Sequence, residues 1–216
     1  MERGKLIVFE GADGSGKSSH AKRVVERIKN WMKETGKPGD CVYHREPFED
    51  LVGATIRASL SGQVRLDPDA AAYLHVASRI EHIREMERQL AAGNYVVCDR
   101  FYLSNMAYNQ TEHLDMKAIY ELNKICRQLI EPDLILYLDV TLEEAKFRRK
   151  KDGSRVQAEL YDADEVQRKV LNRYREIVAF LQEQGVRVST VDAMGPREEV
   201  HARIWEQVLP VLEDRS

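Results

Sequence analysis

The sequence predicts an α/β protein with a five-stranded parallel sheet and helices on both faces, and two observations support this prediction. Five apolar segments rich in β-branched residues recur along the 216-residue chain, and longer segments with helical character separate them. Most of the apolar segments are continuous rather than alternating, which is typical of strands buried on both faces. The predicted strands are 6–9, 41–44, 95–99, 134–140 and 186–191.

A glycine-rich segment follows the first strand and precedes a predicted helix. It consists of Gly11, Ala12, Asp13, Gly14, Ser15, Gly16, Lys17 and Ser18, with Ser19 next in the chain. The pattern G-x-x-x-x-G-K-[ST] between a strand and a helix predicts a phosphate-binding P-loop. Glycine lets backbone amides approach phosphate closely, and a helix N-terminus adds partial positive charge. We expect Lys17 to contact the β- and γ-phosphates of a nucleotide and Ser18 to bind Mg²⁺ through its hydroxyl.

The first half of the chain contains clear helix boundaries. A helix is predicted over 17–35, where Gly36 ends it, and a short one over 51–60. Between them the second strand ends in Arg45-Glu46-Pro47, because a proline disfavours helix at the preceding residue. Asp67-Pro68 has the pattern of an N-cap followed by proline, so a long helix is expected from there to about residue 92.

The second half continues the alternation. After the third strand we expect a polar segment over 101–110 and then one helix from about 115 to 129. The capping box at 141–144 predicts another helix, and one-face apolar spacing predicts a helix from residue 164 and a last one after Pro196. Because no composition break divides the chain, we expect one domain over residues 1–216.

Polar residues stand where predicted strands end, and ligands of open parallel sheets bind at that edge. Asp99 ends the third strand, as a Walker-B acid does, and its carboxylate suits a Mg²⁺ water shell. Arg100 offers a planar fork for a phosphate, and Arg45 ends the second strand. The simpler alternatives are an Asp99–Arg100 ion pair that closes the strand end and a surface arginine at position 45.

A basic run with one glycine stands between two predicted helices, at residues 148–155. It is either a solvated helix face or the start of a lid, at about 148–162, that closes over phosphates. A lid arginine would neutralise charge on a transferred phosphoryl group. The residues alone leave both interpretations open.

Composition limits the partners. The net charge of −3 gives no overall field toward nucleic acid or membrane, so we expect neither as a partner. The three cysteines are widely spaced without a C-x-x-C pair, which indicates neither a zinc site nor a disulfide framework. No apolar run approaches the length of a membrane span, and we expect a cytoplasmic protein.

Three segments together resemble the thymidylate kinase family. They are the P-loop with its preceding Phe9-Glu10, the run Arg45-Glu46-Pro47, and residues 99–108, which have the pattern D-R-[FY]-x-x-S-x-x-A-[YF]. The last pattern is the specific one, because many functions share a P-loop. The resemblance implies a nucleoside monophosphate kinase fold with a mobile lid. It also implies transfer of the γ-phosphoryl group of Mg·ATP to dTMP, giving dTDP and ADP. It further implies a homodimer formed through helices beside the sheet, for which the helix at 68–92 is a candidate surface.

The resemblance further implies individual roles. They are Asp13 at the nucleotide's 3′-hydroxyl and metal shell, Arg45 and Arg100 at the acceptor phosphate, Ser104 and Asn105 beside thymine, Tyr108 against the sugar's 2′ position, and Arg79 at thymine O4. Some members carry a catalytic arginine where this chain has Gly14, and members without it resemble this chain in having lid arginines. This favours the lid interpretation of Arg148, Arg149 and Arg155, with Arg155 the first candidate for catalysis.

Two departures from the family pattern concern the substrate. His75 stands where members usually have a phenylalanine that stacks on thymine, and Phe48-Glu49-Asp50 replaces a Gly-Gly-Thr run. A relative that phosphorylates another monophosphate therefore stays an alternative. A deoxynucleoside kinase would have little use for two arginines at an acceptor phosphate. A GTPase-type switch needs N-K-x-D, and the nearest string, at 123–126, lacks the aspartate.

Overall fold

The computed structural model describes residues 2–152 and 164–214. In this part of the chain five strands form one parallel sheet in the order β2-β3-β1-β4-β5. The strands are β1 (Leu6–Glu10), β2 (Cys41–Arg45), β3 (Tyr95–Asp99), β4 (Leu134–Asp139) and β5 (Val188–Asp192). They confirm the predicted α/β class, and each overlaps a predicted strand.

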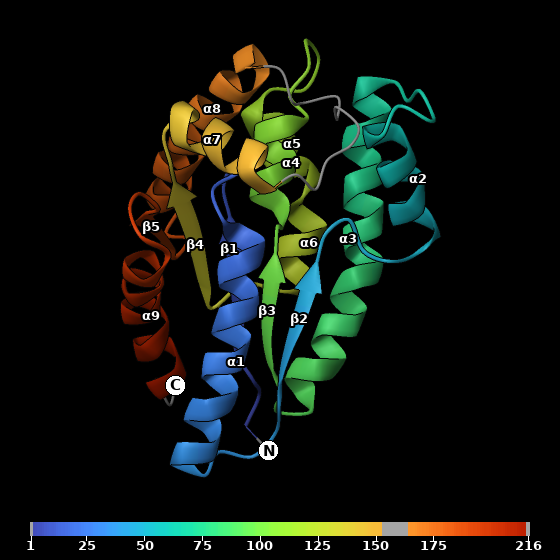
Figure 1. Cartoon of the computed structure of the whole chain (residues 1–216). Coiled ribbons are helices and arrows are strands. Elements are labelled where there is room, and N and C mark those ends of the chain that lie inside the picture. Colours follow the sequence, from blue (N-terminus) through green and yellow to red (C-terminus); the bar gives the residue numbers. More distant parts are fainter. Residues whose placement is uncertain (1, 153–163, 215–216) are drawn as a thin grey trace.

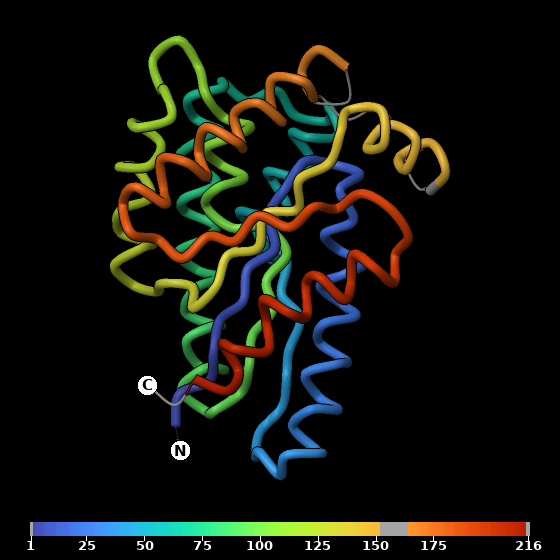
Figure 2. The backbone as a smooth tube through the Cα atoms, turned by 90° about the vertical axis from the view of Figure 1, so that its left-hand side faces the viewer, coloured from blue at the N-terminus to red at the C-terminus, as the bar shows by residue number. Residues whose placement is uncertain are grey.

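Helices connect successive strands and cover both faces of the sheet. They are α1 (Lys17–Thr35), α2 (Leu51–Leu60), α3 (Pro68–Ala91), α4 (Tyr102–Tyr108), α5 (Met116–Leu122), α6 (Lys124–Leu129), α7 (Leu142–Asp152), α8 (Asp164–Glu183) and α9 (Arg197–Glu213). Figures 1 and 2 show α1 and α9 on one face and α3, α4 and α8 on the other. The carboxyl ends of the strands point to the end of the molecule where α7 lies (Figure 1).

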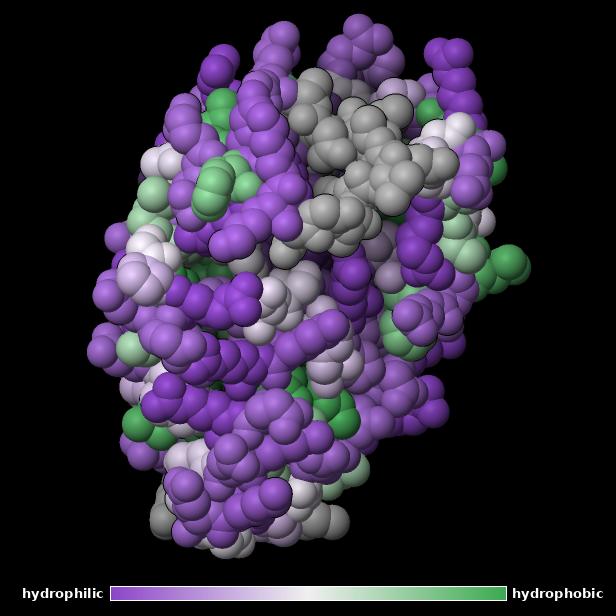
Figure 3. Space-filling view, in the orientation of Figure 1, coloured by the Kyte–Doolittle hydropathy of each residue, from purple (hydrophilic) through white to green (hydrophobic). Residues whose placement is uncertain are grey.

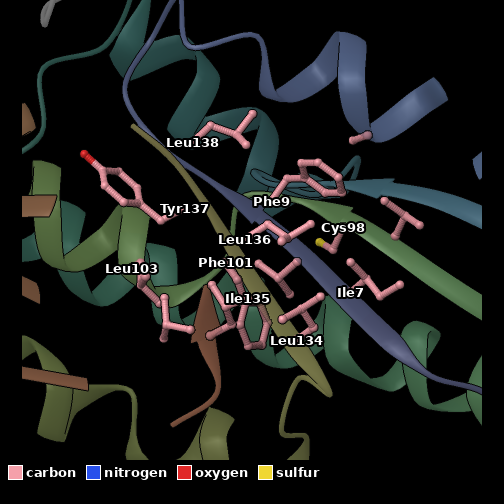
Figure 4. Packing of buried hydrophobic residues seen from close by; sticks show 14 of the residues in the cluster. Ile7, Phe9, Cys98, Phe101, Leu103, Leu134, Ile135, Leu136, Tyr137 and Leu138 are labelled. Carbon is pink, nitrogen blue, oxygen red and sulfur yellow. The ribbon is translucent and has the colours of Figure 1, made fainter. Parts of the chain in front are cut away.

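The core lies around the central strands. All five residues of β1 and of β3 are buried, as expected for strands covered on both faces. Figure 4 shows side chains of β1, β3 and β4 packed together, among them Phe9, Cys98 and Leu136. The edge strand β2 is less buried, which leaves its carboxyl end accessible.

Helix boundaries follow the predicted signals in most places. Helix α1 begins directly after the P-loop and ends before Gly36, which has a left-handed φ of 69°. The Asp67 side chain accepts hydrogen bonds from the amides of Asp69 and Ala70 and caps α3. In the predicted capping box, the Thr141 hydroxyl accepts from the Glu144 amide at 3.3 Å.

Two predictions were wrong in detail. Residues 101–110 are largely the buried helix α4 rather than a polar segment outside a helix, because their polar groups find partners inside the protein. The single helix expected over 115–129 is broken into α5 and α6 at Asn123. The side-chain amide of Asn123 donates to the Ile119 carbonyl at 2.8 Å, so this carbonyl is shared between the side chain and the backbone N–H of Asn123.

Hydrophilic residues predominate on the face shown in Figure 3, and hydrophobic residues form separate small areas there. Across residues 2–152 and 164–214, every helix is too short or too polar to cross a membrane.

Candidate active site

The P-loop connects β1 to α1 at the carboxyl edge of the sheet. Gly16 has a φ of 92° and precedes the first turn of α1. Gly14 has a φ of 87°, and a Cβ there would lie only 2.3 Å from the Ala145 carbonyl oxygen of α7. The backbone of α7 therefore excludes any side chain at position 14, which is the position where some thymidylate kinases carry an arginine.

Lys17 is buried against the loop that precedes it. Its Nζ donates to the Ala12 carbonyl at 2.8 Å and lies 3.9 Å from Asp13 Oδ1. Burial, together with the Arg100 charge, lowers the pKa of Lys17 to about 8. An anion beside this ammonium group would favour its charged form, as expected for a phosphate-binding lysine.

Asp99 and Ser18 form an oxygen-rich cluster next to Lys17. The Ser18 hydroxyl donates to Asp99 Oδ2, and the Tyr43 hydroxyl donates to the same oxygen at 3.1 Å. Asp99 Oδ1 is buried and has no hydrogen-bond partner in the described part of the chain. Because Mg²⁺ prefers oxygen ligands, this donor set fits Mg²⁺ held together with nucleotide phosphates.

Arg100 joins the P-loop to the neighbouring helix. Its Nη2 donates to Asp13 Oδ1 at 2.5 Å and its Nη1 to Ser104 Oγ at 3.0 Å, while the guanidinium lies over the Tyr108 ring at 5.2 Å. Among residues 2–152 and 164–214 it is the sole non-glycine residue with a positive φ, 75°. Such strain persists where surrounding contacts enforce it, often at functional sites.

Glu10, which received no role from the sequence, holds the residues that follow Arg100. Its Oε1 accepts from the amides of Phe101 at 2.7 Å and Ser104 at 3.1 Å, and its Oε2 accepts from the Ser104 hydroxyl at 2.6 Å and the Tyr174 hydroxyl at 3.0 Å. Burial raises the pKa of Glu10, although these hydrogen bonds oppose the rise. An acid at the end of a continuous apolar strand was the signal that could have identified it.

A cavity of about 760 Å³ opens beside the P-loop. The predicted site residues that line it are Asp13, Arg45, His75, Arg100, Ser104 and Tyr108. The end of β2, the segment after it and α2 supply most of the other lining residues, which are Tyr43, His44, Glu46, Pro47, Phe48, Glu49, Arg57, Leu60, Ser61 and Asn109. Burial and the Arg79 charge lower the pKa of His75 to about 4, so its imidazole is neutral near pH 7.

Two other predicted substrate residues lie behind this cavity rather than on its wall. Arg79 is 1% exposed, and its guanidinium donates to the Glu46 carboxylate at 2.5–3.1 Å and to Asn123 Oδ1 at 2.5 Å. Although burial opposes it, the Arg79 charge holds the pKa of Glu46 below its ordinary value, and the pair is ionised. Asn105 is also 1% exposed, and its amide nitrogen contacts the Ala72 carbonyl at 3.3 Å.

Helix α7 brings two of the predicted lid arginines to the P-loop. Arg149 Nη1 donates to the Asp13 carbonyl at 2.8 Å. Arg148 Nη2 donates to the Ala193 carbonyl after β5 at 2.8 Å, and its Nε to Glu144 at 2.7 Å. Arg155 and most of the predicted lid lie outside the described residues. Arg148 Nη1 also donates to the Ser15 carbonyl at 3.4 Å, so Arg148 and Arg149 both place a cationic group against the P-loop.

A P-loop that faces an arginine-lined cavity across the carboxyl edge of a parallel sheet defines a class of protein, the nucleoside monophosphate kinases. Within that class, the sequence model of the family described as thymidylate kinase matches residues 9–204. The chain therefore belongs to the thymidylate kinase family. Enzymes of this family transfer the γ-phosphoryl group of ATP to dTMP, and this is the activity of the chain.

Individual relatives are similar to this chain over most of their lengths. A thymidylate kinase from Synechococcus sp. is 34% identical over 209 residues, 96% of this chain and 95% of the relative. A probable thymidylate kinase from Pyrococcus abyssi is 32% identical over 94% of both chains. Another from Methanococcus aeolicus is 33% identical over 81% of this chain and 79% of its own length.

Proposed function

We propose that residues 1–216 act as one kinase domain, which binds Mg·ATP at the P-loop and dTMP in the 760 Å³ cavity. The observation that carries this assignment is the contact between Arg100 and Asp13 at 2.5 Å. One guanidinium from the end of β3 reaches the phosphate-binding loop and also lines the cavity. Donor and acceptor sites are therefore adjacent, as in-line transfer of a phosphoryl group requires.

On the donor side, the backbone amides of Gly11–Ser19 and the Lys17 ammonium group bind the phosphates of ATP. The residues that would hold Mg²⁺ are Ser18 and Asp99, with Asp13 close to its water shell. The chemistry that Mg²⁺ supplies when bound is neutralisation of phosphate charge.

On the acceptor side, Arg45 and Arg100 bind the phosphate of dTMP, and Tyr108 packs against the deoxyribose. The thymine ring lies toward His75, Ser104 and Asn105, with Arg79 behind them. An acceptor phosphate oxygen is already anionic near neutral pH, so the reaction needs alignment and charge neutralisation more than a general base. Arg149 and Arg155 neutralise charge on the transferred group, and Arg155 is the first candidate for this role.

The test is release of ADP in a coupled assay with Mg·ATP and a panel of dTMP, dUMP, UMP, dCMP, dGMP, dAMP and thymidine. We expect strong preference for dTMP. Preference for another monophosphate would keep the fold and the chemistry but assign His75 and the segment 48–50 to a different base. Activity on thymidine alone, or on none of the panel, would contradict the proposal.

We also propose that the protein is a cytoplasmic homodimer formed through α3. Tyr73 of α3 and Ile125 and Leu129 of α6 are about half exposed, and the two helices pack together. The three cysteines are buried and free, as suits a reducing compartment. Light scattering should give twice the chain mass, and Tyr73→Glu should shift it toward the monomer, whereas Phe147→Glu on α7 should not.

A further inference from the structure

The side chain of His82 contacts three alternate residues, one near the end of β2 and two in the segment that follows it. Its ring is fully buried on α3 and does not line the cavity within the described residues. His82 Nε2 lies 2.8 Å from His44 Nδ1. Its Nδ1 makes no hydrogen bond within the described residues and lies 3.5 Å from Glu46 Oε1, an electrostatic contact. The ring also stacks on Phe48, with centroids 4.4 Å apart and planes at 15°.

Arg45 stands between the two polar contacts of His82. The Arg45 side chain is exposed, lines the cavity, and makes no hydrogen bond or ion pair with the rest of the described chain. Its position therefore depends on the backbone from which it extends. Pairing with β3 places Arg45 opposite Asp99, and the Glu46 amide donates to the Asp99 carbonyl at 3.0 Å. His82 contacts the side chains on either side of Arg45.

The charges around His82 determine how its two nitrogens are used. Glu46 is ionised beside Arg79, so the proton of a neutral His82 belongs on Nδ1, which faces the carboxylate. Nε2 is then an acceptor for the N–H at His44 Nδ1. Burial and the neighbouring His82 lower the pKa of His44 to about 4, so a neutral His44 is available as that donor near pH 7.

We propose that His82 is a positioning residue of the acceptor site, which holds His44, Glu46 and Phe48 so that Arg45 meets the phosphate of dTMP. This inference rests on the proposed function, in which Arg45 binds that phosphate. His82 acts only through the segment 44–48, so its effect is specific for the acceptor and does not extend to ATP.

The test is His82→Phe, which keeps a buried aromatic ring against Phe48 and removes both polar contacts. We expect the KM for dTMP to rise about tenfold, because the side chains on either side of Arg45 lose the polar contacts that hold them. The KM for ATP should change less than about twofold. In an Arg45→Ala background, His82→Phe should raise the KM for dTMP by less than about threefold, because residues that act as one unit are not additive.

Two further variants separate the loss of the polar contacts from a general loss of stability. Ile83→Val removes a buried methyl group from the next residue of α3, which is 1% exposed, and should lower stability without changing the KM for dTMP. His82→Gln keeps an amide donor and acceptor, so it should raise the KM for dTMP less than His82→Phe does. If His82→Phe does not fold, His82→Gln provides the test instead. It should raise the KM for dTMP about threefold, and this rise should disappear in the Arg45→Ala background.

The outcomes separate the inference from the proposed function. An unchanged KM for dTMP in the His82 variant, an equal rise in the KM for ATP, or full additivity with Arg45→Ala would overturn the positioning role. The same holds if Ile83→Val reproduces the shift. If Arg45→Ala itself leaves the KM for dTMP unchanged, the proposed acceptor site is wrong instead.

Discussion

The phosphate-binding loop and the acceptor cavity are built in opposite ways. The loop is one stretch, Gly11–Ser19, whose shape depends on backbone angles at glycines and on the start of α1. The cavity takes its walls from β2 and the segment after it, α2, α3, α4 and Arg100, and long-range side-chain contacts hold them. Behind the cavity, Glu10 accepts a hydrogen bond from the Ser104 hydroxyl, and His82 and Arg79 both contact the Glu46 carboxylate.

This difference predicts where substitutions act. A change in the loop should alter the groups proposed to bind ATP and leave the fold largely intact, because backbone amides form most of that proposed site. A change behind the cavity removes a partner from a buried polar network, so it affects stability and acceptor binding together. Each prediction below tests one side of this contrast.

The largest expected effect is on the loop side. Lys17→Ala should lower kcat by about a thousandfold or more, because the ammonium group neutralises charge on the transferring phosphate. The urea midpoint should stay near the parent value. Lys33→Ala, at an exposed position near the end of the same helix, is the matched control and should keep full activity. Full activity of Lys17→Ala would remove the loop from the mechanism.

The next effect belongs to the acceptor side. Arg79→Met should lower the free energy of unfolding by about 3 kcal/mol, because it leaves the Glu46 carboxylate buried without its main partner. Urea denaturation measures this, and Arg84→Met, at a position 70% exposed on the same helix, is the control. A variant with parent stability but a raised KM for dTMP would show that Arg79 serves the substrate and not the support of the cavity.

The third prediction concerns two arginines of the predicted lid. Arg155→Ala should lower kcat about a hundredfold while changing the KM for dTMP little, since its proposed role is at the transferred group. Arg149→Ala should have a smaller effect on kcat. A rise in the KM for dTMP alone would assign Arg155 to the acceptor site. A larger loss of kcat in Arg149→Ala would reverse the order of the two.

The smallest effect lies beneath the loop, where His20 of α1 stacks on His201 of α9 with ring centroids 6.0 Å apart. Burial, together with the other ring, lowers the pKa of His20 to about 4, and burial, together with Arg23, does the same for His201. The unfolded chain takes up these protons below about pH 6.5 and the folded chain only near pH 4. The stability that this histidine pair contributes is therefore fully present above pH 6.5 and is lost as the pH falls toward 4.

The check is the urea midpoint at pH 7 and at pH 5. His201→Phe keeps a stacked ring without a titrating group, so it should reduce the loss of stability between these pH values by roughly 2 kcal/mol. His44 and His75 also have pKa values lowered to about 4 and should preserve part of the decline. An unchanged pH dependence in His201→Phe would show that this pair does not contribute.

The sequence determined the parts of the protein that depend on neighbouring residues in the chain. Continuous apolar segments gave the buried strands, Asp67-Pro68 and Gly36 gave helix ends, and the glycine pattern gave the P-loop, because each depends on local backbone preferences. The expected helix at 115–129 failed at Asn123, whose oxygen accepts from Arg79 44 residues away. The sequence of residues 101–110 predicts a polar segment, and it does not reveal that Glu10 of β1 accepts the amide hydrogen bonds that begin the buried helix α4.

Only the tertiary structure decided the roles of groups that act through distant partners. It showed that the α7 backbone excludes a side chain at Gly14, that Arg79 faces Glu46, and that His82 lies behind Arg45. These contacts join residues from 33 to well over 100 positions apart, such as Arg79 with Glu46 and Gly14 with Ala145. Their energy comes from burial and from the pairing of charges, and neither can be deduced from the order of residues until the strands and helices are packed.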